Sequence, residues 1–172
     1  ASGLADWWPG EGNGHAIVGS NNAILESGVT FAPGKVGQAF VLTNYTDGFL
    51  HVPASPSLNI GATGTGITLE GWINVASVDG LHPIAEWYSG VRDILGVQFW
   101  INSSPYSSGG LLAVLYDTNG NRQALTSPEG ILQPNVFQHV AMTYDRTSGM
   151  TTIYLNGAAV AQENMGSFVP QT

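Results

Sequence analysis

The stretch FQHVAMTYDRTSGMTTIYLNGAAV, residues 137–160, decides the predicted fold of this chain. In its first part the apolar Val140, Met142 and Tyr144 alternate with the residues between them, and this period of two is typical of a strand with one buried face. A cluster of turn-forming residues follows at 145–149. The pattern therefore predicts a strand that ends in a turn.

The second part of the stretch predicts two more strands. Residues 151–155 are mostly β-branched, aromatic or aliphatic, which suits the pleated surface of a sheet. Asn156-Gly157 is a common turn pair between antiparallel strands. We expect the apolar residues that face the core from this stretch to be buried, namely Val140, Met142, Ile153 and Leu155.

The same stretch resembles the core of laminin-G-like domains, which belong to the concanavalin A-like lectin and glucanase superfamily. The shared pattern is HVAxTYD followed by YLNGxxV. Near the start of the chain, WWPGEGN at 7–13 and GVTFAPGKVGQAF at 28–40 also resemble these domains. The resemblance implies an all-β jelly-roll sandwich of two antiparallel sheets, and residues 1–172 as one domain.

Short apolar alternations elsewhere in the chain agree with an all-β fold. No run has a sustained helical period, so helices should be few and short. Short strands separated by turns are typical of a sandwich or jelly roll, and 172 residues fit one domain. Further strands are predicted at 36–42, 48–52, 67–75, 81–88, 94–102, 111–116 and 122–126.

The charge balance argues against two classes of partner. The chain has a net charge of −8 and only four basic residues, whereas nucleic-acid binding needs a basic patch for the phosphates. No apolar run reaches the roughly 18 residues that a membrane helix needs, so no membrane insertion is expected. The low charged fraction, 9%, is common in extracellular β-proteins, and we predict a secreted or cell-surface location.

The sequence predicts neither catalysis nor a cofactor. Retaining glucanases need two carboxylates about 5–5.5 Å apart, and no strand carries such a same-face pair. Calcium is the metal that the oxygen-rich loops would suit, and many members of the resembled family bind it through an Asp in the first loop. That loop, 13–19, has no Asp here, and the turn at 117–121 lacks a closing Glu, so calcium is not favoured. We expect His139 to be a hydrogen-bonded structural histidine.

A candidate ligand-binding face lies on the predicted strand at 94–102. Gln98, Trp100 and Asn102 alternate with apolar residues and combine one aromatic ring with two amides. Sugars present apolar C–H faces and hydroxyl rims, which such a set suits. Trp87 and Tyr116 would extend the face, although large aromatics are more often buried in a core.

Two functions follow from these patterns. The first is non-catalytic extracellular recognition, with a carbohydrate or cell-surface glycan as the partner. The alternative is a structural or assembly subunit of a surface layer, fibre or adhesin. The resemblance implies further strands after the YLNG hairpin, whereas only 158–172 follow here. An open sheet edge would then pair with another chain, giving a homo-oligomer or filament with 4–8 or 167–169 as the donated strand, unless the chain is a fragment or its tail covers the edge.

Overall fold

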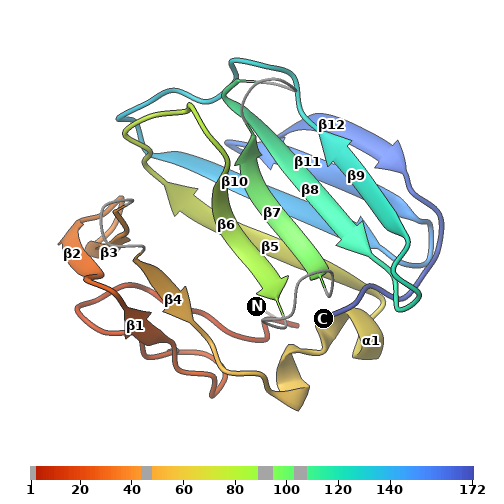
Figure 1. Ribbon diagram of the computed structural model, residues 1–172, viewed down its shortest axis with the longest axis horizontal. Coiled ribbons are helices and arrows are strands. Elements are labelled where there is room, and N and C mark those ends of the chain that lie inside the picture. Colours follow the sequence, from red (N-terminus) through yellow and green to blue (C-terminus); the bar gives the residue numbers. More distant parts are fainter. Residues whose placement is uncertain (1–2, 44–47, 89–94, 103–107) are drawn as a thin grey trace. The chain divides into compact units, whose positions relative to one another are not determined.

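The computed structural model describes residues 3–43, 48–88, 95–102 and 108–172 (Figure 1). Its contacts separate the chain into two compact units, Ala1–Leu58 and Asn59–Thr172. Each unit is described by itself below. The prediction that the whole chain is one domain remains a prediction.

The first unit contains two small antiparallel sheets. Asn21 organises its loops, because the Asn21 side-chain amide donates to the Asp6 carboxylate at 2.6 Å and to the Ser57 hydroxyl at 2.9 Å. The indole N–H of Trp8 donates to the Asn21 carbonyl oxygen at 2.7 Å. The strands pair as β1 (Ile24–Glu26) with β4 (Phe49–His51) and as β2 (Thr30–Pro33) with β3 (Gln38–Val41), and a 3-10 turn, η1 (Pro56–Leu58), ends the unit.

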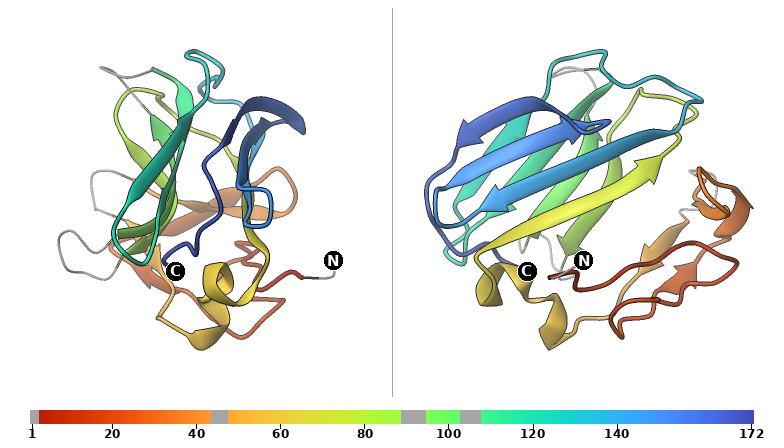
Figure 2. Two further views of the ribbon diagram at one scale, coloured as in Figure 1. Left: turned by 90° about the vertical axis from the view of Figure 1, so that its right-hand side faces the viewer. Right: turned by 180° about the vertical axis from the view of Figure 1, so that it is seen from behind.

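The second unit is a sandwich of two four-stranded antiparallel sheets, and a single short helix, α1 (Ile60–Thr63), precedes its first strand (Figures 1 and 2). The first sheet has the strand order β6-β7-β8-β9 and the second has the order β12-β11-β10-β5. The all-β, jelly-roll prediction is thereby confirmed. The strands are β5 (Gly66–Ile73), β6 (His82–Tyr88), β7 (Leu95–Asn102), β8 (Gly110–Tyr116), β9 (Arg122–Thr126), β10 (Gln138–Asp145), β11 (Met150–Leu155) and β12 (Ala158–Asn164).

The core of this unit consists of the alternate residues that each sheet directs toward the other. Burial of one such side chain stabilises the fold by about 1.5–3 kcal/mol. Of the four residues predicted to be buried, Val140, Met142 and Ile153 are fully buried. Leu155, the last residue of β11, is only half-buried and packs against the edge of the core. The other fully buried large side chains include Val97, Phe99 and Ile101 of β7 and Leu111 and Leu115 of β8.

The C-terminal segment folds back onto both sheets. The Tyr144 hydroxyl lies 3.0 Å from the Gly166 carbonyl oxygen and accepts a hydrogen bond from the Phe168 N–H at 2.9 Å. The N–H of Gln171 then donates to the Tyr116 carbonyl oxygen at 2.8 Å, and its own carbonyl accepts from Val97 at 3.2 Å. The segment therefore ties β10 of one sheet to β7 and β8 of the other.

Candidate functional site

The outer face of the β6-β7-β8-β9 sheet carries the predicted aromatic and amide set. Residues directly opposite each other on antiparallel strands point to the same side of the sheet. Trp100 of β7 lies opposite Leu112 of β8, and Gln98 lies opposite Val114. Since Val97, Phe99 and Ile101 point into the core, Gln98, Trp100 and Asn102 lie on the outer face, as the alternation predicted.

The polar groups of this face are more buried than the sequence suggested. Gln98 and Asn102 are buried, while Trp100 is partly exposed. The indole N–H of Trp100 is itself buried and has no hydrogen-bond partner in the described part of the chain. The N–H is closed to solvent, and the acceptor that lies near it is the Glu86 carboxylate, so the ring of Trp100 and not its N–H is the part that a ligand can contact.

Glu86 shares the face with Trp100, because β6 pairs Glu86 with Gln98 of β7. Burial raises the pKa of the Glu86 carboxyl, and the nearby indole N–H of Trp100 partly offsets this rise. A carboxylate and an aromatic N–H therefore lie close together beside two buried amides.

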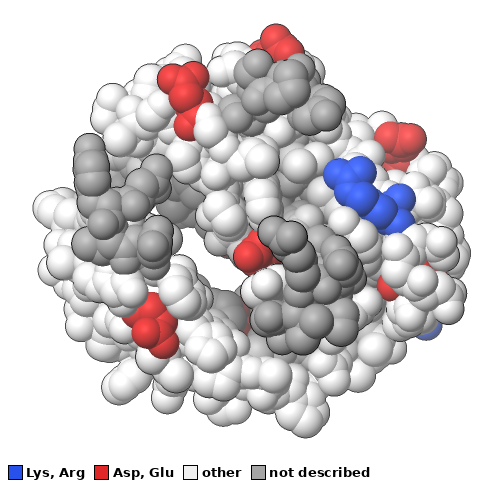
Figure 3. All heavy atoms as spheres, in the orientation of Figure 1, with Lys and Arg blue, Asp and Glu red and all other residues white. Residues whose placement is uncertain are grey.

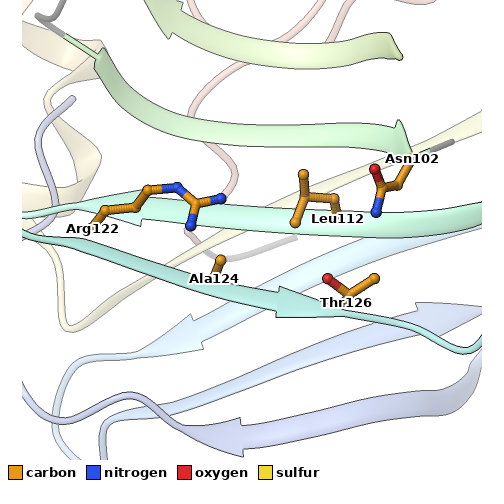
Figure 4. A pocket seen from close by; sticks show the side chains of 5 residues that line it. All are labelled: Asn102, Leu112, Arg122, Ala124 and Thr126. Atoms are coloured by element: carbon orange, nitrogen blue, oxygen red, sulfur yellow. The ribbon is translucent and has the colours of Figure 1, made fainter. Parts of the chain in front are cut away.

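A cleft of about 440 Å³ opens on β7, β8 and β9 (Figure 4). Its lining combines apolar side chains, Leu112 and Ala124, with the Asn102 amide, the Thr126 hydroxyl and the Arg122 guanidinium. Figure 4 shows the Arg122 side chain extending toward Leu112, with Asn102 on the other side of Leu112. The cleft thus has an apolar floor, a positive end and an amide end.

The turn between β8 and β9 is a hairpin held by its own first residue. The Asp117 carboxylate accepts hydrogen bonds from the N–H groups of Asn119 and Asn121 and from the Asn121 amide, each at 2.8 Å. These bonds lower the pKa of Asp117. The carboxylate is therefore used by the turn itself.

Four of the five predicted ligand-binding residues share this face. Tyr116 lies opposite Arg122 at one end of the β8-β9 pair, and it shares the outer face with Gln98, Trp100 and Asn102 of β7. Trp87 is different, because it packs against the hydrophobic core. Trp87 was included because it lies near the predicted face in sequence, whereas the pairing of Glu86 with Gln98 puts Glu86 on the outer face and its neighbour Trp87 on the side of the core.

Sequence reasoning missed the residues that β9 contributes to the cleft. Arg122 and Thr126 were recognised as the ends of a hairpin strand but not as site residues. The signal was present, because Arg122, Ala124 and Thr126 alternate and the hairpin places Arg122 opposite Tyr116. Figure 3 shows one compact group of basic atoms over β9, the strand that contributes Arg122.

Two features are absent from the described residues. Among them, no group of three or more His, Cys, Asp or Glu side chains is arranged to hold a metal ion. A helix long and apolar enough to span a bilayer is likewise not found among the residues that the structure describes.

Comparison with protein families identifies the family to which the chain belongs. Residues 44–172 match the laminin-G-like family model of the concanavalin A-like lectin and glucanase superfamily, so the chain belongs to this family. No curated protein matches the chain significantly.

One solved structure agrees on the fold. The chain is similar to the CBM40 module of the Ruminococcus gnavus IT-sialidase, solved with α2,3-sialyllactose, at 17% identity and a TM-score of 0.54, covering 86% of this chain and 69% of that one. It is also similar, at 25% identity and a TM-score of 0.45, to a Bacteroides ovatus protein described as a candidate carbohydrate binder. That match covers 63% of this chain and only 28% of the Bacteroides protein. Neither comparison supports the alternative of an assembly subunit.

Proposed function

We propose that this chain is a non-catalytic carbohydrate-recognition module that binds glycan on the outer face of the β6-β7-β8-β9 sheet. The observation that carries the proposal is the joint position of the partly exposed Trp100 and the cleft at Asn102 on one sheet face. An aromatic ring packs against the C–H face of a sugar, while amides bind the surrounding hydroxyls. The names of the two similar structures point to the same class of ligand.

The chemistry of the cleft favours binding over hydrolysis. Glycoside hydrolysis needs two carboxylates that flank the scissile bond. The five residues that line the cleft are neutral or basic, and the carboxylate near Trp100, that of Glu86, has no acidic side chain opposite it across the β6-β7 pair. A glycan-binding module of this kind would act outside the cell or at its surface.

Replacement of two tryptophans tests the proposal. A glycan array first identifies a ligand, and titration calorimetry then compares Trp100→Ala with Trp72→Ala, whose indole is 49% exposed on the outer face of the other sheet. Loss of ring stacking should weaken binding at least about tenfold in Trp100→Ala, which corresponds to 1.4 kcal/mol. Trp72→Ala should bind like the wild type.

A third variant separates binding from folding. Trp100→Phe keeps an aromatic ring but removes the buried N–H, so it should fold with a melting temperature near that of the wild type and show an intermediate affinity. If glycan affinity is the same in all three variants, ligand binds elsewhere and this face is not the site.

A further inference from the structure

Arg122 is one of the few basic residues of the chain, and its side chain lines the cleft. The full sequence contains Lys35, Arg92, Arg122 and Arg146 against twelve acidic residues. Arg146 serves the fold: its guanidinium donates to the carbonyl oxygens of Gly61, Ala62 and Gly64, each at 3.4 Å, at the end of α1. Arg122 has a different environment.

The Arg122 side chain makes no ion pair or hydrogen bond with any described residue. The acidic residue nearest to it in sequence, Asp117, is held by three hydrogen bonds within the hairpin turn. The guanidinium therefore keeps its five donors for a ligand. Its planar fork fits a carboxylate or a sulfate by two parallel hydrogen bonds, which a hydroxyl group cannot accept in the same way.

The rest of the cleft suits a sugar ring attached to that anionic group. Leu112 and Ala124 form an apolar floor between Arg122 and the amide end, where Asn102 and Thr126 offer an amide and a hydroxyl. The net charge of −8 repels anions at long range, but salt screens this repulsion beyond about 8 Å at physiological ionic strength. Local contact with Arg122 then decides whether an anion binds.

We propose that the cleft selects a glycan that carries an anionic group, a carboxylate or a sulfate, and that Arg122 binds this group. The proposal rests on the carbohydrate-binding function proposed above and adds the charge of the ligand. Recognition combines a charge-assisted pair at Arg122 with apolar contact at Leu112 and a hydrogen bond at the Thr126 hydroxyl.

Matched probes test the charge of the ligand. Calorimetry compares sialyllactose with its methyl ester, trigalacturonate with its methyl ester, and sulfated lactose with lactose. Each pair shares its sugars and differs in charge, so the first two arms test carboxylate and the third tests sulfate. The anionic member of at least one pair should bind about tenfold more tightly, and this preference should weaken as salt is raised.

Two Arg122 variants test the residue. Arg122→Gln should weaken binding of the anionic member about tenfold more than binding of the neutral member, and Arg122→Lys should restore part of the preference, because lysine keeps the charge but loses the fork. Equal binding of both members of every pair, or an unchanged preference in Arg122→Gln, would overturn this inference and leave the carbohydrate-binding function standing. If neither these probes nor any glycan on the array binds, both proposals fail.

Discussion

The two outer faces of the sandwich differ in how their polar groups are used. On the β12-β11-β10-β5 sheet, neighbouring side chains interact with one another. The His139 ring lies 3.8 Å from the Glu70 carboxylate and contacts Trp72 edge-on at a centroid distance of 5.3 Å. The Gln162 amide donates to the Thr152 hydroxyl at 2.9 Å. The 3.8 Å separation is longer than a hydrogen bond, so the prediction that His139 is a hydrogen-bonded structural histidine stays a prediction.

The outer face of the β6-β7-β8-β9 sheet leaves donors unused within the described residues. The Arg122 guanidinium makes no ion pair or hydrogen bond with any described residue and lies beside a cleft with an apolar floor. Both faces come from strands with the same alternating pattern. The comparison teaches that recognition is indicated by donors that the fold does not satisfy, and not by the number of polar or aromatic residues.

The largest effect should come from the core that both faces share. Phe99 is 1% exposed and lies between Gln98 and Trp100 on β7. Phe99→Ala should destabilise the fold by about 3–5 kcal/mol, because it leaves a cavity under the β6-β7-β8-β9 sheet. Urea unfolding followed by tryptophan fluorescence measures the loss. A change below about 1 kcal/mol would show that the sandwich is packed differently.

A smaller loss of stability is expected at the contact between β10 and the C-terminal segment. Tyr144→Phe keeps the ring that stacks on Phe168 at a centroid distance of 5.0 Å but removes the hydroxyl bonded to the segment. The buried partner groups then lack a hydrogen bond, which should cost about 1–3 kcal/mol. Thermal unfolding measures this, with Tyr154→Phe as the control. Equal melting temperatures for the two variants would show that the Tyr144 hydroxyl does not hold the C-terminal segment.

Glu86 should make the stability of the folded protein depend on pH. Because burial raises the pKa of this carboxyl in the folded protein, the folded state holds the proton more tightly than the unfolded chain. Stability should therefore decrease as pH rises through the interval between the ordinary carboxyl pKa and the raised one. Glu86→Gln removes this dependence, so the difference in stability between the variant and the wild type should change in favour of the variant as pH rises through that interval. Parallel stability–pH curves for the two proteins would contradict the assignment.

The opposite face should respond weakly to charge removal. Glu70 is well exposed, and its contact with His139 is a surface pair. Glu70→Gln should change the free energy of unfolding by no more than about 1 kcal/mol, and should leave glycan affinity unchanged. A larger loss of affinity would place ligand on this face and reverse the comparison between the two sheets.

Removal of calcium should have the smallest effect of all. The Asp117 carboxylate is bonded within its own turn, and the sequence lacks the first-loop Asp that the family resemblance implies for calcium. Addition of EDTA should therefore leave the melting temperature unchanged. A drop of several degrees that calcium restores would show a bound ion that stabilises the folded state.

The sequence by itself determined the strands of the sandwich and most of their faces, whereas β1 and β2 of the first unit were not predicted. A period of two places alternate side chains on opposite sides of a strand, so the burial of Val140 and Met142 and the outward position of Trp100 could be predicted. The motifs shared with laminin-G-like domains predicted that these strands form a two-sheet sandwich. Nearness in sequence was a poorer guide than alternation, because Trp87 follows the outward Glu86 on β6 and packs against the core.

Only the tertiary structure decided which outer-face residues meet. Arg122, Leu112 and Asn102 come from three different strands, and their common cleft depends on the register of β7 and β9 against β8. Likewise, Glu86 meets Trp100 because β6 pairs with β7. Alternation fixes the side of a strand on which a residue lies, but the pairing of strands fixes its neighbours, and the neighbours determine whether a donor is satisfied or left for a ligand.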